Sequence, residues 1–262
     1  MRSALTSRQS RGAVIVDLAD GHEVAAAVSG SAVRREGRHA SAGSEDVPRS
    51  GIDRDARIIA IKPSGVDYAT LHPEDIVVVS LDDGRVVEGD GRPSSDTPTH
   101  LVLYRSFPEL GGVVHTHSVH ASAWAQARRE IPGLGTTHAD HFHGPVPVTR
   151  WLTDAEIQAD YEAHTGRVIV ERFTEAGIDP TAVPACLDAG HGPFTWGETP
   201  HEALVNAIVL EQVARQAIHT LAIEPGTGPI PGALLDKHFQ RKHGPAAYYG
   251  QPRSGSEAPA GG

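Results

Sequence analysis

Gly112-Val113-Val114-His115-Thr116-His117 is the stretch on which the fold prediction rests. Its paired valines favour a buried β-strand. On a strand, side chains two residues apart face the same side of the sheet, so His115 and His117 can present two imidazoles to one ion. Taken alone, the pair is equally consistent with a polar strand surface.

His191 is the best candidate for a third metal ligand. It lies in Gly190-His191-Gly192-Pro193, where the glycines allow the backbone to bend and a ligand to approach closely. Three protein ligands with one open position are typical of a catalytic metal site. The single cysteine, Cys186, excludes a disulfide framework and a multi-cysteine zinc site. Its apolar surroundings predict a buried core residue.

Strands and helices alternate on both sides of this central stretch. Asp82-Asp83-Gly84 predicts a hairpin turn, and Thr153–Glu156 and Thr199–Glu202 have the pattern of capping boxes that open helices. The alternation predicts an α/β layered domain with a mixed sheet. The expected strands cover residues 57–61, 76–81, 85–88 and 112–117, and the expected helices cover residues 98–107, 121–129, 153 to about 162, and 199 to about 221.

The two ends of the chain have a different composition from the middle. Residues 1–49 are rich in Ala, Gly, Ser and Arg, with short strands expected at 14–16 and 24–28 and loop or disorder at 29–31 and 34–44. We therefore predict an atypical, poorly ordered segment over residues 1–49, a folded domain over 50–251 and a disordered tail over 252–262.

Two loops have the composition of a phosphate site. Ser94, Ser95 and Asp96 lie just ahead of a helix that has Pro98 in its first turn, where free amides and the helix dipole favour an anion. Simple capping by Thr97 or Asp96 is the commoner use of such a pattern. The second loop, residues 62–65, supplies a lysine, a serine and a flexible glycine.

Residues 136–143 concentrate titratable groups in a stretch without a clear period. Asp140 is a candidate general acid/base with histidines around it, although loop surface explains the stretch equally well. Tyr248 and Tyr249 lie near the C-terminus. A tyrosine pair usually packs, and an acid/base tyrosine needs a nearby cation to lower its pKa.

Length and charge exclude several classes of protein. The 262 residues can form one large domain with a substantial core. A formal charge of −10 with no basic run predicts no binding to nucleic acid or to an anionic membrane. No apolar run approaches membrane-spanning length and no signal-peptide pattern opens the chain, which predicts a cytoplasmic protein.

Taken in order, the motifs resemble the class II aldolase/epimerase family, and within it the L-ribulose-5-phosphate 4-epimerases. The resemblance runs from about Ser50 to Gln251. It is carried by the phrases IKPSGVDY (61–68), PSSDTPTH (93–100), GVVHTHS (112–118), GTTHAD (135–140), HGPF (191–194), LDKH (235–238) and YYGQ (248–251).

This resemblance implies a three-layer α/β/α domain with a central mixed, mostly antiparallel sheet, assembled as a homotetramer with active sites between subunits. The implied cofactor is Zn²⁺, with Mn²⁺ or Co²⁺ as alternatives. Asp140 and Tyr249 would reach the site from the neighbouring subunit as the two acid/base residues. The implied metal residues are His115, His117 and His191, with Asp96 close by, and the implied substrate and phosphate residues are Lys62, Ser64, Gly65, Ser94, Ser95, Thr136, Glu162 and His238.

The implied reaction interconverts L-ribulose 5-phosphate and D-xylulose 5-phosphate in pentose catabolism, such as that of L-arabinose. The C4 hydrogen is not acidic, so inversion at C4 proceeds by retro-aldol cleavage and re-formation of the C3–C4 bond. The alternatives are a class II sugar-phosphate aldolase acting on a substrate such as L-fuculose phosphate, and a non-catalytic scaffold like the adducin head domain.

The N-terminal region departs from the family pattern. Where the family has a Gly-Asn-Val-Ser phosphate turn, this chain has Val47-Pro48-Arg49-Ser50, and register resumes at Ser50. Two hypotheses explain the change: a mis-set reading frame or start site before residue 50, and a natural divergent N-terminus. Ala189-Gly190 also replaces a frequent His-Ser pair, but His191 is retained, so we expect metal binding to survive.

Overall fold

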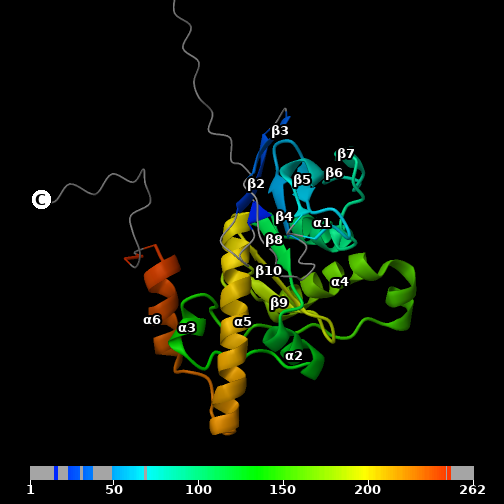
Figure 1. The fold of residues 1–262 in the computed structure, drawn as a ribbon. Coiled ribbons are helices and arrows are strands. Elements are labelled where there is room, and N and C mark those ends of the chain that lie inside the picture. Colours follow the sequence, from blue (N-terminus) through cyan, green and yellow to red (C-terminus); the bar gives the residue numbers. More distant parts are fainter. Residues whose placement is uncertain are drawn as a thin grey trace, which may run out of the picture.

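A sheet of seven strands forms the centre of the molecule, in the order β7-β6-β5-β4-β8-β10-β9 (Figure 1). The computed structural model describes residues 15–16, 23–29, 32–37, 49–67, 70–245 and 247–248. The strands are β4 (Arg49–Asp53), β5 (Ile58–Ile61), β6 (Val77–Ser80), β7 (Val86–Glu88), β8 (Gly112–His115), β9 (Ala185–Leu187) and β10 (Pro193–Gly197), and the 3₁₀ helix η2 (Pro73–Asp75) precedes β6.

Strand pairing places β8 inside this sheet, between β4 and β10. Val114 lies opposite Arg49 of β4 on one side and Thr195 of β10 on the other, and both pairings are antiparallel. The remaining described pairs of the sheet are antiparallel too, with one isolated parallel bridge between Val148 and Leu187 at its edge. The predicted α/β class and antiparallel character are confirmed, but the expectation of a mixed sheet is wrong, because each strand pair described in this sheet is antiparallel.

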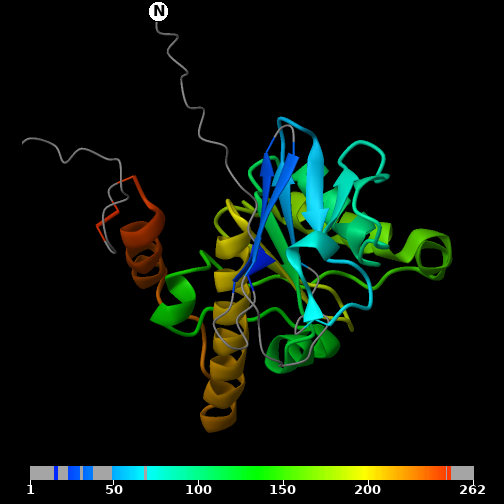
Figure 2. The same cartoon turned by 45° about the horizontal axis from the view of Figure 1, so that its top comes forward.

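Helices cover both faces of the sheet, and alternation along the strands decides which face each side chain meets. Val113 joins a buried cluster with Leu103 of α1 and Phe173 of α4. The next residue, Val114, packs instead against Ala203 and Leu204 of α5. The result is a three-layer α/β/α arrangement (Figure 2). The helices are α1 (Thr97–Ser106), α2 (Val119–Ala127), α3 (Thr136–Ala139), α4 (Asp154–Ala176), α5 (Pro200–Ile223) and α6 (Gly232–His243).

The two predicted capping boxes form to different extents. At α4, Thr153 accepts a hydrogen bond from the Glu156 amide and Glu156 accepts one from the Thr153 amide. At α5, Thr199 accepts from the Glu202 amide, but the Glu202 carboxylate accepts from the Glu198 amide instead, so only half of that box is present. Helix α4 is interrupted by a kink at Asp160, which has the non-helical angles φ −151° and ψ 80°, close to the predicted end of this helix; a second helical segment that was not predicted continues to Ala176 and packs on α1.

The N-terminal segment contains more strand than the sequence predicted. Strands β1 (Ile15–Val16), β2 (Glu23–Ser29) and β3 (Ala32–Gly37) form a second, antiparallel sheet. The expectation of a loop over residues 34–44 is therefore wrong for 34–37. Pairing with β2 supplies partners for this backbone without requiring a hydrophobic period in the sequence. Residues 38–44, Tyr249 and the tail 252–262 lie outside the described residues.

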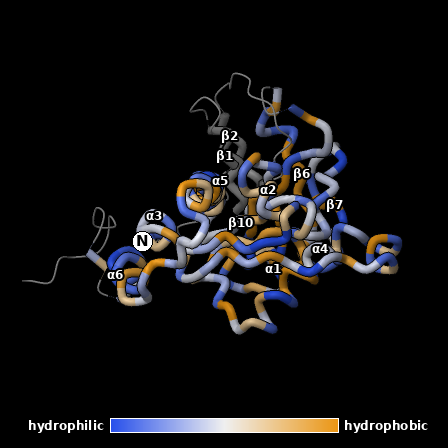
Figure 3. The backbone as a smooth tube through the Cα atoms, turned by 90° about the horizontal axis from the view of Figure 1, so that it is seen from below, coloured by the Kyte–Doolittle hydropathy of each residue, from blue (hydrophilic) through white to orange (hydrophobic). Residues whose placement is uncertain are grey.

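Helices α3 and α6 lie to one side of the sheet (Figure 3). Helix α6 contacts α3, and its last turn is basic, with Arg241, Lys242 and His243. No helix in the described part of the chain is long and apolar enough to cross a membrane. The predicted buried thiol is confirmed, since Cys186 is fully buried and its burial raises the pKa of that thiol.

Candidate metal centre and active site

Three histidines meet where two neighbouring strands of the sheet, β8 and β10, end and begin. His115 is the last residue of β8, His117 lies two residues after it, and His191 lies just before β10. The Nε2 atom of His117 is 3.1 Å from Nε2 of His115 and 3.0 Å from Nε2 of His191. Within the described residues, this is the one group of three or more His, Cys, Asp or Glu side chains whose ligand atoms converge tightly enough to hold an ion.

Hydrogen bonds made by Nδ1 of His115 and of His191 fix the tautomer of these two rings. The Nδ1–H of His115 donates to the carbonyl oxygen of Pro193 at 3.0 Å. The Nδ1–H of His191 donates to the Asp188 carboxylate at 3.1 Å. In the neutral rings Nε2 therefore carries a lone pair, and both lone pairs are directed at the same small space.

A divalent ion fits this donor set. Ligands about 2.0–2.1 Å from a tetrahedral zinc ion lie about 3.3 Å from one another, close to the 3.1 and 3.0 Å that separate Nε2 of His117 from Nε2 of His115 and of His191. One Nε2–H on His117 cannot satisfy two lone pairs at once, whereas one cation can. Burial, followed by the nearby His191, lowers the pKa of His115 well below its usual range, so that ring is neutral and able to ligate.

Packing around the cluster explains the glycine and the aromatic residue of the HGPF phrase. The ring of Phe194 stacks on His115 with centroids 4.1 Å apart. A Cβ atom on Gly192 would lie 2.6 Å from the Thr116 carbonyl oxygen and 3.2 Å from His117 Cδ2. Only glycine at position 192 lets the segment before β10 approach the segment after β8 closely enough for the three rings to meet.

The pairing of His115 with His117 has a different cause from the one the sequence predicted. Strand β8 ends at His115, so His117 does not share a strand face with it. The two rings meet because the chain turns after the strand and Ser118 starts α2. The Glu211 carboxylate of α5 fixes that turn by accepting hydrogen bonds from the amides of His120 and Ala121, both at 3.0 Å.

Asp96, predicted to lie close to the metal, is outside the three-histidine cluster. It is the N-cap residue of α1, where its side chain makes no capping hydrogen bond. Burial, then the charge of Asp188, and less strongly the charge of Asp96 raise the pKa of Tyr161. The Tyr161 ring lies 6.2 Å from His191, so Asp96 is within electrostatic reach of a residue that borders the cluster.

The two predicted phosphate loops lie side by side. The Ser64 amide donates to the Arg92 carbonyl at 2.9 Å, and the Ser94 amide donates to the Lys62 carbonyl at 3.0 Å. Lys62 is almost completely buried, while Ser64, Gly65 and Ser95 are exposed. Gly65 has φ +69° and open space around it, which leaves its backbone accessible to a ligand.

Asp140 belongs to a separate cluster, at the junction of α3 and α6. Its carboxylate accepts hydrogen bonds from Arg241 at 2.8–3.1 Å and from His238 at 3.0 Å, and Lys242 lies 3.7 Å away. Burial alone would raise the pKa of Asp140, but these cationic and hydrogen-bonding partners lower it on balance. The predicted residue Thr136 starts the same short helix, α3.

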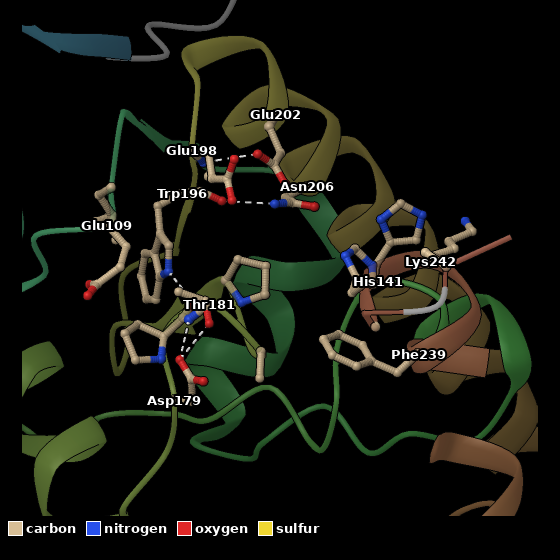
Figure 4. A pocket seen from close by; sticks show the side chains of 18 of the residues that line it. Glu109, His141, Asp179, Thr181, Trp196, Glu198, Glu202, Asn206, Phe239 and Lys242 are labelled. Carbon is tan, nitrogen blue, oxygen red and sulfur yellow. Dashed lines mark hydrogen bonds between the residues drawn. The ribbon is translucent and has the colours of Figure 1, made fainter. Parts of the chain in front are cut away.

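A cavity of about 820 Å³ lies next to the Asp140 cluster. Figure 4 shows Trp196, Asp179 and Thr181 on one side of it and Phe239 and Lys242 of α6 on the other. His141, beside Asp140 in the chain, also lines it, and burial followed by the Lys242 charge lowers the pKa of His141 to about 4. None of the three clustered histidines lines this cavity.

The remaining predicted residues divide between these regions. Glu162, on α4, accepts a hydrogen bond at its backbone oxygen from the Thr99 hydroxyl of α1 at 2.6 Å. His238 contacts Asp140. Two residues of the site were missed, Asp188 and Arg241. The spacing of Asp188 three residues before His191, and of Arg241 three residues after His238, was the available signal.

The chain belongs to the class II aldolase and adducin N-terminal domain family, whose model matches residues 35–218. It is 55% identical over 202 residues to the L-ribulose-5-phosphate 4-epimerase UlaF of Salmonella paratyphi A (strain ATCC 9150 / SARB42), a match that covers 77% of this chain and 87% of that protein. The enzyme of the same name from Salmonella paratyphi C (strain RKS4594) is 54% identical over the same share of each chain.

Solved structures agree with this family. The fold is similar to that of an L-fuculose 1-phosphate aldolase, with a TM-score of 0.60 and 25% identity over 74% of this chain and 84% of that one. It is also similar to the L-fuculose-1-phosphate aldolase of Thermus thermophilus, with a TM-score of 0.53 and 23% identity over 69% and 86% of the two chains. The second likeness supports the fold alone.

Proposed function

We propose that this protein is a metal-dependent L-ribulose-5-phosphate 4-epimerase that interconverts L-ribulose 5-phosphate and D-xylulose 5-phosphate. The observation that carries the proposal is the convergence of His115, His117 and His191, in a chain 55% identical to proteins of that name. A non-catalytic scaffold would have no reason to keep three aligned imidazole lone pairs. The ion we propose is zinc, with manganese or cobalt as alternatives.

A bound divalent ion would supply Lewis-acid stabilisation of the negative charge that develops on substrate oxygens when the C3–C4 bond breaks. The protein contributes the geometry around it. The exposed hydroxyls of Ser64 and Ser95, the Gly65 amide and the buried Lys62 form adjacent loops suited to a phosphate. Holding the phosphate keeps the cleaved aldehyde in place until it rejoins, which is what separates an epimerase from an aldolase.

Two proton-transfer groups are needed on opposite faces of the substrate, and we assign them to Asp140 and Tyr249. Asp140 is held ionised by Arg241 and His238, as a base requires. Tyr248, the residue before Tyr249 in the chain, donates its amide hydrogen bond to the Arg241 carbonyl of α6 at 3.1 Å.

The acid/base pair is proposed to serve the metal centre of a neighbouring subunit. Among the described residues, every hydrogen bond and ion pair of the Asp140 side chain goes to α6, and the cavity beside it contains none of the three histidines. A homotetramer with active sites between subunits would bring the two clusters together. The cytoplasmic location expected from the sequence stays a prediction.

The deciding experiment incubates metal-loaded protein with L-ribulose 5-phosphate and measures D-xylulose 5-phosphate, with a chelator-treated sample as control. Conversion that disappears with chelator and returns with added zinc is the expected result. Release of free aldehyde without epimer would establish the aldolase instead. A folded, metal-containing protein that does neither would contradict the proposal.

A repaired variant separates a wrong assignment from a damaged phosphate site. Val47→Gly, Pro48→Asn and Arg49→Val restore the family turn ahead of Ser50. We expect this triple variant to lower KM for the phosphorylated substrate and leave metal content unchanged. Strand β4 already begins at Arg49, and the buried Ser50 hydroxyl lies 2.7 Å from His100 Nδ1, so the repair joins a segment that is in place.

A further inference from the structure

We propose that Asp188 is a positioning residue for metal binding: it orients the His191 ring as the third ligand, and Thr149 in turn holds Asp188. This inference rests on the metal centre of the proposed function. Asp188 is not one of the three converging residues that could hold the ion. Its effect passes through the imidazole of His191.

The two oxygens of the Asp188 carboxylate have different partners. Oδ2 accepts from Nδ1 of His191 at 3.1 Å, and Oδ1 accepts from the Thr149 hydroxyl at 3.1 Å. The Thr149 oxygen accepts from the Ala189 amide at 2.9 Å, so it bridges the carboxylate to the loop that carries His191. A ring that rotated away from the cluster would have to break this relay.

The loop itself leaves little freedom for compensation. The Asp188 amide donates to the Gly192 carbonyl at 2.9 Å, and the His191 amide donates to the Asp188 carbonyl at 3.1 Å. Gly190, with φ +75°, donates to the Ala125 carbonyl at 2.9 Å and lies against the Trp151 ring. The backbone hydrogen bonds therefore fix the position of the His191 main chain, and the Asp188 carboxylate fixes the orientation of its ring.

Charge gives the second argument. The Asp188 side chain is only 4% exposed. In the part of the chain that the structure describes, its sole ion-pairing partner is His191, and no lysine or arginine pairs with it. A buried carboxylate without a cation is strongly unfavourable. A divalent ion on the opposite nitrogen of His191 supplies the missing positive charge through the ring, and the carboxylate raises the basicity of that nitrogen.

The test measures metal affinity directly, by titrating zinc into apo protein in competition with a chromophoric chelator. For Asp188→Asn we expect about a 10–100-fold weaker affinity, since the amide oxygen still accepts the Nδ1 hydrogen bond but carries no charge. Thr149→Val keeps the charge and removes the hydroxyl, so it should weaken binding in the same direction and by less. The absorption bands of the cobalt-substituted protein should shift in both variants.

Thr195→Val is the matched control. Thr195 is also a buried threonine, but its hydroxyl donates to the Ala203 carbonyl of α5 at 2.9 Å and, at the longer distance of 3.5 Å, to the Val114 carbonyl of β8, and neither acceptor belongs to the loop that carries His191. It should lower the unfolding temperature without changing zinc affinity or the cobalt spectrum. This pattern separates a positioning role from a general loss of stability.

The outcomes keep the two proposals apart. Wild-type protein that binds no divalent metal would overturn the metal centre, and this inference with it. Wild-type protein that binds zinc and turns over L-ribulose 5-phosphate, beside an Asp188→Asn variant with unchanged zinc affinity and cobalt spectrum, would overturn only the role of Asp188.

Discussion

The three-histidine cluster and the Asp140 cluster are built by opposite means. The histidines lie at the end of β8, just after it and just before β10, and a backbone carbonyl and a carboxylate orient the rings of His115 and His191. Asp140 is a single carboxylate surrounded by cationic side chains of one helix, α6, which lies beside the sheet. Imidazole nitrogens favour a metal cation, while nearby cationic side chains favour the ionised form of a carboxylate. One region is therefore suited to bind an ion and the other to accept a proton.

The sharpest way to break this comparison is to remove a metal ligand. His117→Ala leaves two imidazoles, and we expect loss of tightly bound metal together with a fall in kcat of about a thousandfold or more, because Lewis-acid stabilisation contributes several kcal/mol. Metal content after dialysis and steady-state epimerase assays measure the two effects. Full activity in a variant without metal would refute the role of the cluster.

Asp140→Asn tests the other half of the comparison. We expect kcat to fall by about 10²–10⁴-fold, since the amide cannot take up a proton, while zinc affinity stays at the wild-type value. Epimerase kinetics and zinc titration on the same preparation check both statements. Weakened zinc binding would show that the two clusters are not independent.

Arg241→Met is expected to shift a pH profile. Arg241 helps to lower the pKa of Asp140, so its loss lets burial raise that pKa. The acidic limb of kcat, below which Asp140 is protonated, then moves to higher pH. His238, Lys242, His243 and His141 remain around the carboxylate and limit the shift.

The interaction between Asp140 and Arg241 also makes the free energy of unfolding depend on pH. Because the folded-state pKa of Asp140 is lowered, its contribution to the free energy of unfolding is present at neutral pH and is lost as pH falls through that lowered pKa. Arg150→Met is the control for the pH profile of Arg241→Met, since Arg150 pairs with Glu156 and Glu171 at 2.7–2.9 Å, away from Asp140. It should leave the acidic limb of activity where it is in the wild type.

The smallest expected effect concerns the loop that carries His191. Gly190 and Gly177 have similar positive φ values, +75° and +62°, but a Cβ on Gly190 would lie 2.3 Å from the Trp151 ring, whereas Gly177 has open space. Gly177→Ala should cost about 1 kcal/mol through backbone strain alone, and Gly190→Ala about 1 kcal/mol more because Trp151 must move. Chemical denaturation measures both, and equal losses would show that the Trp151 contact is unimportant.

Local motifs predicted much of the centre of the molecule. Strand β8, helices α1, α2 and α5 and the choice of His115, His117 and His191 as candidate ligands follow from short-range patterns: apolar runs, capping residues and histidine spacing. The reason proposed for the His115–His117 pairing was wrong, because the strand ends between them. The residue types predicted which histidines come together, although the predicted local geometry was different.

Strand β3 and the continuation of α4 beyond its kink at Asp160 were not predictable in the same way. Strand β3 depends on pairing with β2, and the second half of α4 depends on packing against α1. Neither partner is encoded in the local sequence of the element itself. For the same reason half of the α5 capping box is replaced, because Glu202 bonds the Glu198 amide instead.

By itself, the sequence determined an acidic α/β domain, three candidate metal ligands and two phosphate-type loops, because each depends on residue types within a few positions of one another. Only the tertiary structure decided that the two phosphate loops touch, that Asp188 and Thr149 orient His191, and that Arg241 holds Asp140 ionised. These contacts join residues up to about a hundred positions apart, and folding into three layers, not sequence spacing, sets the distances between them.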